Sequence, residues 1–284
     1  MNRTFKGSYK SNFLIDLSNN DYHEHDSVSK SILDRINIAP NRVLFHKQKY
    51  IDAFRIGSAF HAFILEPEKD LVKIAPEALR NNKDGKQIWY DFFKSCGSQS
   101  DYSELKVSDW PELFERETNC NYITPQELKQ FEYMKENIYK NELASNLLGL
   151  EGVSESSLFW TDPLTKLTCR CRPDFLSKDN LTVVDLKTIQ TADMKSFMKS
   201  SYFRRYHVQA AMYMRGVFEV TGELPDFYFI ASEKEFPYSS AVYKFGPETI
   251  QTGNYIYRNN LDLLANCVET NDWPSYPNNL KLEL

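Results

Sequence analysis

The sequence contains little cysteine, no low-complexity tract and no long apolar run. Its five cysteines, an odd number, stand at positions 96, 120, 169, 171 and 267, without the C-x-x-C spacing that zinc sites favour. No segment approaches the roughly 18 consecutive apolar residues that cross a bilayer, and the first six residues lack the apolar core of a secretion signal. These absences argue against a disulfide scaffold, a zinc knuckle and a membrane protein. We therefore expect reduced thiols and a cytoplasmic location.

The composition is that of an ordinary folded protein. Of the 284 residues, 42% are hydrophobic, 14% aromatic and 26% charged, which is enough for a buried core in one large domain or two small ones. The net charge of −5 argues against a uniformly basic protein. Residues 165–215, however, hold ten Lys/Arg and four Asp, a local charge of +6 that leaves −11 for the rest. This excess fits either an anion-binding surface or a solvated face.

Helical patterns dominate the first half of the chain. Residues 27–33 have the pattern of a capped helix start, and a second helical stretch covers about 50–65. A capping box with proline at the first helical position predicts a helix over about 124–148. Residues 69–120 show no clear period, so we expect irregular chain with short helices there.

From residue 155 the apolar period changes to two, which predicts strands. The pattern predicts three successive antiparallel strands, then a long helix, two more strands and a last helix, at 157–160, 167–175, 181–188, 194–220, 226–232, 240–245 and 247–268. The predicted fold class is α/β (α+β), a mixed central sheet flanked by helices, with a mainly helical N-terminal half. In the second strand, Cys169 and Cys171 should face the core, and Arg170 and Arg172 the solvent.

Two aspartates and a lysine form the strongest candidate site. Asp174 closes the second predicted strand and Asp185 lies in the third, so antiparallel pairing can bring their carboxylates together. Lys187, two residues after Asp185, shares its face. Two carboxylates suit Mg²⁺, and the lysine could orient or deprotonate a water molecule. The alternative is a turn residue beside an exposed strand pair, but the strand around Asp185 is apolar, where an unpaired carboxylate is costly.

Further polar residues could support such a site or serve only the fold. His61 lies four residues after Gly57, on the same helical face, where glycine would allow close approach to a crowded site. Gln209 and Tyr213 are also four apart, with Tyr206 beneath them. Arg204 and Arg205 could meet phosphates or form a solvated pair, and His207 is either structural or exposed.

These segments together resemble a known family. Arg172-Pro173-Asp174 and Asp185-Leu186-Lys187 resemble the PD-(D/E)xK nuclease superfamily, and its RecB-like branch in particular. Residues 57–67 are similar to the upstream histidine motif of that branch, and Gln209 to Tyr213 to its Q-x-x-x-Y motif. With residues 123–128, the set resembles the RecE, or exonuclease VIII, nuclease domain over about residues 27–268.

The resemblance implies a role for each matching residue. The metal ligands would be His61, Asp174, Asp185 and the Leu186 carbonyl, with Lys187 serving the hydrolytic water and Gln209 and Tyr213 supporting the site near DNA. Asp185 stands where many superfamily members have Glu, as in the RecE group. The implied cofactor is Mg²⁺, two ions, with Mn²⁺ as a substitute, and the implied reaction is in-line attack of water on a phosphodiester.

The resemblance also implies substrate, partners and organisation. The family degrades linear double-stranded DNA from its ends, 5′ to 3′, and leaves 3′ single strands for recombination by strand annealing. Expected partners are a RecT-like annealing protein and further copies of the chain in a ring, with a tetramer favoured, and no membrane. A bacterial, phage or prophage origin follows. Residues 1–284 would form a single nuclease domain, with a helical part over 1–150, a catalytic core over 151–270 and a tail over 271–284.

Other functions remain possible from the sequence. A Cas4- or AddB-like iron–sulfur nuclease is excluded, because it needs one upstream cysteine and three near the C-terminus, and only Cys267 follows Cys171. A site-specific endonuclease would cut internally, and a catalytically inactive DNA-binding or phage interaction protein would keep only the fold. The aromatic cluster at 89–93 either wedges a DNA end or packs in the core.

Overall fold

The computed structural model describes residue 5 and residues 13–45 and 51–276. The predicted start of a helix at residue 50 and the last eight residues of the predicted tail lie outside these ranges. In the first half, short strands separate helices of 4 to 16 residues. The elements are β1 (Phe13–Ile15), α1 (Asn19–Glu24), α2 (Lys30–Ile38), α3 (Arg42–Phe45), α4 (Asp52–Leu65), η1 (Pro67–Lys69), β2 (Val72–Ile74), α5 (Lys83–Ser95), η2 (Val107–Asp109), α6 (Trp110–Thr118), β3 (Asn121–Ile123), α7 (Pro125–Lys140) and α8 (Glu142–Leu148).

The second half supplies most of the strands. Its elements are β4 (Gly152–Ser154), β5 (Ser157–Thr161), β6 (Thr168–Cys171), β7 (Phe175–Ser177), β8 (Thr182–Ile189), α9 (Met194–Phe203), α10 (Tyr206–Thr221), β9 (Asp226–Glu233), β10 (Ser240–Lys244) and α11 (Pro247–Thr270). Strands β8 to β10 and helix α11 agree with the sequence prediction to within one or two residues.

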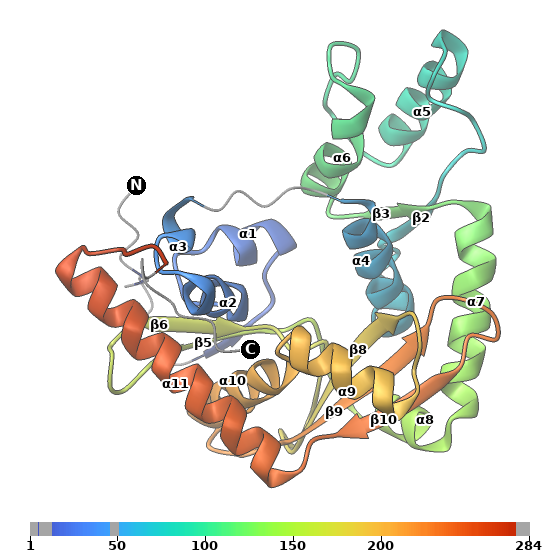
Figure 1. Ribbon diagram of the computed structural model, residues 1–284. Coiled ribbons are helices and arrows are strands. Elements are labelled where there is room, and N and C mark those ends of the chain that lie inside the picture. Colours follow the sequence, from blue (N-terminus) through green and yellow to red (C-terminus); the bar gives the residue numbers. More distant parts are fainter. Residues whose placement is uncertain (1–4, 6–12, 46–50, 277–284) are drawn as a thin grey trace, which may run out of the picture.

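A five-stranded mixed sheet forms the centre of the molecule, in the order β10-β9-β8-β7-β4 (Figure 1). The central strand β8 pairs in parallel with β9, from Thr182↔Asp226 to Ile189↔Glu233, and the other neighbours are antiparallel. A parallel pair requires a crossover, which α9 and α10 provide. The predicted fold class, a mixed sheet flanked by helices after a mainly helical half, is confirmed.

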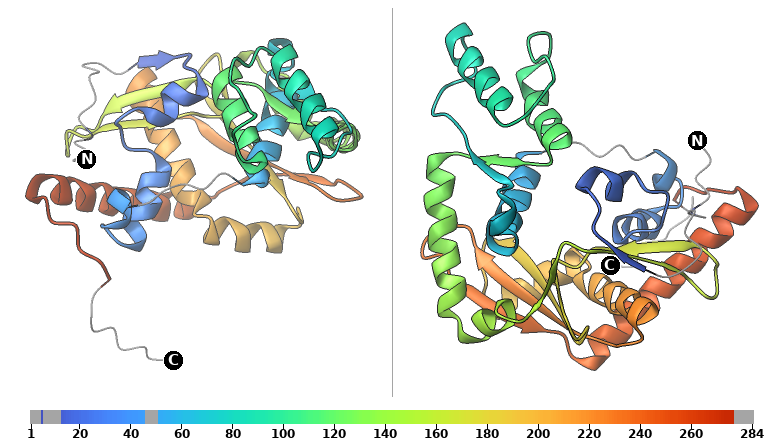
Figure 2. Two further views of the ribbon diagram at one scale, coloured as in Figure 1. Left: turned by 90° about the horizontal axis from the view of Figure 1, so that it is seen from above. Right: turned by 180° about the vertical axis from the view of Figure 1, so that it is seen from behind.

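The two faces of this sheet pack against different helices (Figures 1 and 2). Val184 and Leu186 of β8 pack in one cluster with side chains of α4 and α7, while Val183 packs with α2, α10 and α11. Because side chains alternate along a strand, Asp185 and Lys187 share the face of Val183. They lie on one face of the strand, as the period-two pattern predicted, and this face packs against α10.

The predicted second strand, 167–175, is wrong in one respect. It divides into β6 and β7, which belong to different sheets: β6 pairs with β5 in the three-stranded sheet β1-β5-β6, and β7 pairs with β8. Pro173 lies at the break, and proline has no N–H to donate to a ladder. The three predicted strands are consequently not one antiparallel series.

Two predicted helices are also divided. The stretch 194–220 forms α9 and α10, separated at Arg205, whose φ of 57° is left-handed and cannot continue a helix. The stretch 124–148 forms α7, with the predicted capping box at Thr124, and α8. Asn141 separates them, since its extended backbone ends α7 and its side chain accepts a hydrogen bond from the Ala144 N–H.

Arg170 contradicts the prediction that it faces solvent. It is only 4% exposed, like the other residues of β6, and its guanidinium donates to the carbonyl of His25 and to the hydroxyl of Ser27. These bonds satisfy the Nη1 donors of the buried guanidinium. Cys169 and Cys171 are in the core as predicted, and none of the five cysteines forms a disulfide.

Residues 69–120 form an arm that projects from the rest of the molecule (Figure 1). Helices α5 and α6 pack there around an aromatic cluster that includes Trp89, Phe93 and Phe114. Phe93 and Phe114 are fully buried and stack with centroids 4.6 Å apart. The segment is therefore more regular than predicted, because its aromatic residues form a small core of their own. Of the two alternatives for residues 89–93, core packing describes Trp89 and Phe93.

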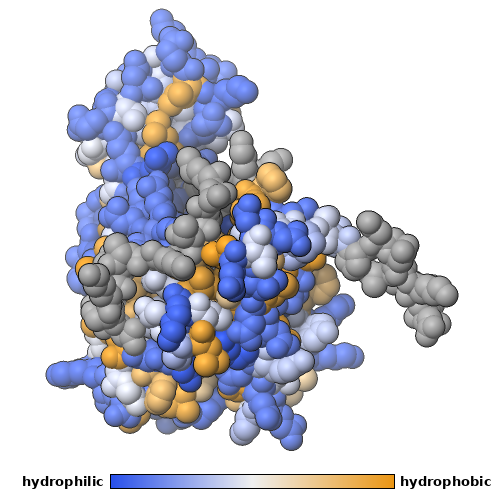
Figure 3. Space-filling view, turned by 90° about the vertical axis from the view of Figure 1, so that its left-hand side faces the viewer, coloured by the Kyte–Doolittle hydropathy of each residue, from blue (hydrophilic) through white to orange (hydrophobic). Residues whose placement is uncertain are grey.

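On the face that Figure 3 shows, hydrophilic residues predominate and hydrophobic residues are scattered in small groups. None of the helices in the described part of the chain combines the length and the apolar character that a membrane crossing requires.

Candidate active site

Acidic and basic side chains from helix α4, strand β8 and two connecting segments lie close together beside the central sheet. His61 projects from α4, and Asp174 directly precedes β7. Glu155 lies between β4 and β5, in a left-handed conformation with φ of 50°. Asp185 and Lys187 lie on the central strand β8. One hydrogen bond joins Asp174 to β8, because the Asp174 carboxylate accepts a hydrogen bond of 2.6 Å from the Leu186 N–H.

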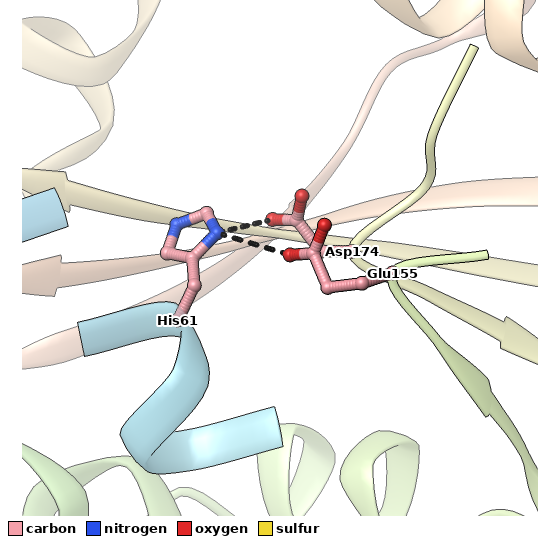
Figure 4. Close-up of side chains that lie close together, drawn as sticks. All are labelled: His61, Glu155 and Asp174. Carbon is pink, nitrogen blue, oxygen red and sulfur yellow. Dashed lines mark ion pairs between the residues drawn. The ribbon is translucent and has the colours of Figure 1, made fainter. Parts of the chain in front are cut away.

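His61, Glu155 and Asp174 form the first part of the site (Figure 4). The Nδ1 atom of His61 lies 3.4 Å from Asp174 Oδ2 and 3.8 Å from Glu155 Oε1. Burial alone would lower the pKa of His61, but the two carboxylates outweigh burial and raise its pKa to about 9. The two carboxylates therefore favour the protonated form of the imidazole.

Asp185, Lys187 and Gln209 form the second part. Asp185 has no exposed surface; its Oδ1 accepts a hydrogen bond of 2.5 Å from Gln209 Nε2, and its Oδ2 pairs with Lys187 Nζ. Burial, together with the charge of Asp174, raises the pKa of Asp185 to about 6 against the opposing effect of Lys187. Lys187 also lies 5.1 Å from the centre of the Tyr206 ring. Gln209 of α10 therefore holds the Asp185 carboxylate in a fixed orientation.

The pKa of Lys187 bears on its chemistry. Burial favours the neutral amine, but the charges of Asp185 and Asp174 outweigh burial and raise the pKa of Lys187 above its ordinary value. The side chain is 18% exposed. Lys187 is therefore a cation that donates hydrogen bonds, so of the two predicted roles the geometry suits orientation of water or phosphate better than removal of a proton.

A cavity of about 480 Å³ opens onto the first part of the site. Its acidic residues outnumber its basic ones: Asp16, Glu66, Glu115, Glu155 and Asp174 against Lys69, Arg172 and His61. An acidic cavity of this kind repels a bare phosphate and attracts a cation.

The donor atoms present fit a divalent cation. Among the described residues, one ligand atom from each of His61, Glu155 and Asp174 lies within 4.8 Å of the other two. Carboxylate oxygens are the ligands that Mg²⁺ and Mn²⁺ prefer, and imidazole also accepts Mn²⁺. Asp185 is not part of this group; its Oδ1 accepts a hydrogen bond from Gln209 and its Oδ2 pairs with Lys187. Its predicted role as a ligand, and that of the Leu186 carbonyl, stay predictions.

Glu155 is the site residue that the sequence reasoning missed. It follows β4, a strand of three residues whose Ser154 pairs with Phe175, so Glu155 comes next to Asp174 and donates its N–H to the Asp174 carbonyl at 3.1 Å. A short strand gives almost no periodic signal. The available signal is an acid directly before the first strand of the predicted series.

The predicted supporting residues are placed less uniformly. Gln209 is in the site. The partly buried Tyr213 packs edge-to-face on Phe227 with centroids 6.1 Å apart; burial raises the pKa of its hydroxyl, and the charges of Asp185 and Asp174 add to this effect. Arg204 is exposed. Arg205 pairs with Asp34 at 3.1 Å and donates to the Leu33 carbonyl, so it joins α10 to α2 and is not a free phosphate contact.

Three further expectations have outcomes. His207 is 7% exposed and thus structural. Arg172 donates to Ser157 Oγ and to the Leu17 carbonyl, and lies 4.2 Å from the centre of the Tyr22 ring, so it supports the wall of the cavity. The close approach expected at Gly57 is wrong: no atom of the described residues lies within 4 Å of the position of its Cβ.

The mixed sheet, with two acids and a lysine at its centre, defines a PD-(D/E)xK nuclease-like domain. The profile of a family described as "PDDEXK-like domain of unknown function (DUF3799)" matches residues 29–282, and the chain belongs to this family.

Among solved structures, the chain is similar to a crystal structure of a Eubacterium rectale protein that is provisionally described as an exonuclease. The two share 15% identity with a TM-score of 0.57, over 90% of this chain and 88% of that chain. At this identity the likeness shows a shared fold. No curated protein sequence matches the chain.

Proposed function

We propose that the protein is a divalent-metal-dependent exodeoxyribonuclease that degrades linear double-stranded DNA from its ends. One observation carries the proposal: the hydrogen bond from the Leu186 N–H to Asp174 joins the cation-binding cluster of His61, Glu155 and Asp174 to the buried pair Asp185 and Lys187. A cation site beside a fixed lysine is what hydrolysis of a phosphodiester needs.

The residues that would hold the cation are His61, Glu155 and Asp174, with Asp185 on the adjoining strand. Bound there, Mg²⁺ supplies positive charge that stabilises the phosphodiester oxygens as negative charge develops. The presence of three acids beside one histidine is compatible with two ions and with replacement by Mn²⁺.

The chain's own groups have separate tasks. Lys187 donates hydrogen bonds into the site, and Asp185 with Tyr206 fixes its position. Gln209 holds Asp185 and so acts through it as a positioning residue. Tyr213, one turn further along α10, packs against β9 and fixes the helix that carries Gln209.

The finer parts of the proposal rest on the resemblance to the RecE nuclease domain. They are 5′ to 3′ degradation, a 3′ single strand as product, recombination by annealing with a RecT-like partner, a ring-shaped tetramer and a cytoplasmic location in a bacterial or phage context. A single nuclease domain over residues 1–284 belongs to the same proposal.

The test is degradation of linear duplex DNA labelled at the 5′ or the 3′ end, with Mg²⁺, with Mn²⁺ and with chelator. Release of the 5′ label first, dependence on the cation and survival of closed circular DNA are the expected results. Cutting of the circle would identify an endonuclease instead. Degradation unchanged in Asp174→Ala and Lys187→Ala would refute the assigned site.

A further inference from the structure

Helix α9 exposes an aromatic and apolar strip. Met194, Met198 and Tyr202 recur every four residues, so they lie on one face of the helix, and they are 66%, 62% and 78% exposed. Phe203, at the end of the helix, is 86% exposed. Scattered single apolar residues on a surface need no explanation, but a continuous strip marks an interaction site.

The same helix is cationic. Lys195, Lys199 and Arg204 are exposed, and α9 itself contains no acidic residue. Three acids lie near its ends. Asp193 caps the helix by accepting a hydrogen bond from the Ser196 N–H at 3.1 Å, Glu233 accepts one from the Ala192 N–H, and Asp34 pairs with Lys30 and Arg205. Charge complementarity therefore favours a polyanionic occupant over an apolar or basic one.

The last residues of the strip, Tyr202 and Phe203, precede Tyr206 of the candidate active site by four and three residues. Tyr206, two residues after Arg204, lies against the ammonium group of Lys187. Lys30 donates a hydrogen bond of 2.7 Å to the Arg204 carbonyl and fixes the turn between α9 and α10. The ring of Tyr202 stacks on His207, with centroids 6.3 Å apart and planes 8° from parallel. One face of the Tyr202 ring is thus supported from behind.

We infer that α9 is the track of a single DNA strand that continues into the active site. Its bases stack on Tyr202 and Phe203, and its phosphates lie against Lys195, Lys199 and Arg204. The inference rests on the proposed nuclease function and adds the path of one strand to it. A single strand is the fitting occupant because unpaired bases offer their faces to aromatic side chains, whereas bases within a duplex stack on one another. The flexible thioethers of Met194 and Met198 adapt to any base.

The test separates binding from cleavage. Full-length protein in chelator is titrated against a fluorescent oligothymidylate of roughly 15 nucleotides, and binding is followed by anisotropy. Tyr202→Ala and Phe203→Ala are each expected to weaken binding about tenfold, whereas Tyr202→Trp retains it. The matched control is Tyr255→Ala, which removes another exposed helical aromatic, 68% exposed on α11.

The basic residues have a distinct signature. The double variant Lys195→Ala/Lys199→Ala is expected to reduce the slope of log affinity against log salt by about 1.4, since each phosphate contact on a single strand contributes about 0.7. Lys86→Ala, an exposed lysine on α5, should leave the slope unchanged. Because all these side chains are exposed, unchanged melting temperatures are expected and verify folding.

Several results would overturn the track. The first is that wild-type protein does not bind the oligonucleotide, and the second is that the Tyr202 and Phe203 variants bind it normally. The third is that these variants lose affinity for blunt duplex DNA as much as for the single strand. A changed oligomeric state in the Tyr202 variant would make α9 a protein interface instead. The proposed function is judged separately. If wild-type protein cleaves DNA and the Tyr202 variant still binds the oligonucleotide normally, the function stands and the track is refuted. If binding depends on Tyr202 but wild-type protein cleaves no DNA, the track stands and the function is refuted.

Discussion

Gln209 on α10 donates a hydrogen bond of 2.5 Å to Asp185 on β8, a carboxylate with no exposed surface. The bond stabilises the ionised form of Asp185. Gln209→Ala removes it and should raise the pKa of Asp185 further above its present value of about 6. Ionised Asp185 is then lost at a higher pH, so the acidic limb of the pH–rate profile should move to higher pH. A lower rate with an unmoved limb would contradict this role.

Lys187→Met should lower kcat on linear duplex DNA by about 100- to 1000-fold, because it removes a cation that Asp185 fixes beside the predicted reaction centre. The measurement is initial rate at saturating Mg²⁺. Lys178→Met is the control, since Lys178 pairs with Glu151 on the surface and is 78% exposed. A rate within twofold of wild type would exclude a catalytic role for Lys187.

Glu155→Gln should weaken cation binding by at least about tenfold, because it replaces a carboxylate of the cluster with an amide of equal size. Calorimetric titration with Mn²⁺ measures the effect. Glu151→Gln, four residues earlier and 81% exposed, is the control. If both variants bind Mn²⁺ like wild type, His61 and Asp174 hold the ion without Glu155.

Asp162 should make stability depend on pH. Although burial opposes ionisation, hydrogen bonds from Thr165 and the ion pair with Arg258 hold the pKa of Asp162 below its ordinary 3.8. A depressed carboxyl pKa stabilises the fold above the unfolded-state pKa, and this contribution is lost as pH falls through the folded-state pKa. Asp162→Asn should therefore lower the free energy of unfolding at neutral pH, with the difference from wild type shrinking below about pH 4.

Denaturant titrations at both pH values measure this difference. Asp262→Asn removes the other carboxylate that contacts Arg258, at 2.7 Å, but from a side chain that is 58% exposed. It should have little effect at either pH. A pH-independent loss in Asp162→Asn would assign the effect to packing.

Two glycine substitutions should have opposite signs. A Cβ on Gly253 of α11 would lie 2.2 Å from the His207 carbonyl oxygen of α10, so Gly253→Ala should force the helices apart and destabilise the protein by about 1–3 kcal/mol. Gly57→Ala, inside α4 and clear of described atoms, should stabilise by up to about 1 kcal/mol. Thermal melting of both variants measures these changes: the melting temperature should fall for Gly253→Ala and rise for Gly57→Ala.

The parts of the site that lie on long periodic elements were predictable from the sequence. Asp185 and Lys187 share a face because side chains alternate along the eight-residue strand β8, and Asp174 meets β8 through an antiparallel turn. The helical period predicted only that Gln209 and Tyr213 share a face of the helix, and the place of Gln209 at the site was expected from the family resemblance. Asp174 and Asp185 are brought together as predicted, although their role in metal binding stays a prediction.

The rest depends on conformations that local pattern does not encode. Glu155 and Arg205 adopt left-handed backbones, and the surrounding packing holds them there against the intrinsic preference of such residues. Pro173 could have indicated a break within the predicted strand 167–175, but not that the chain would pass from one sheet to another. The order within the arm depends on contacts such as that between Phe93 and Phe114, which are twenty-one residues apart.

The arm contributes to the wall of the cavity but not to the cation cluster. Its chain leaves the body at β2 and returns at β3, which lies alongside it with Val72 opposite Asn121. Glu115 and Asn119, at the base of the arm, line the cavity but do not belong to the cation cluster. An insertion or exchange within the arm can thus remodel the entrance to the cavity while the ligands stay in place, so access and chemistry are free to evolve independently.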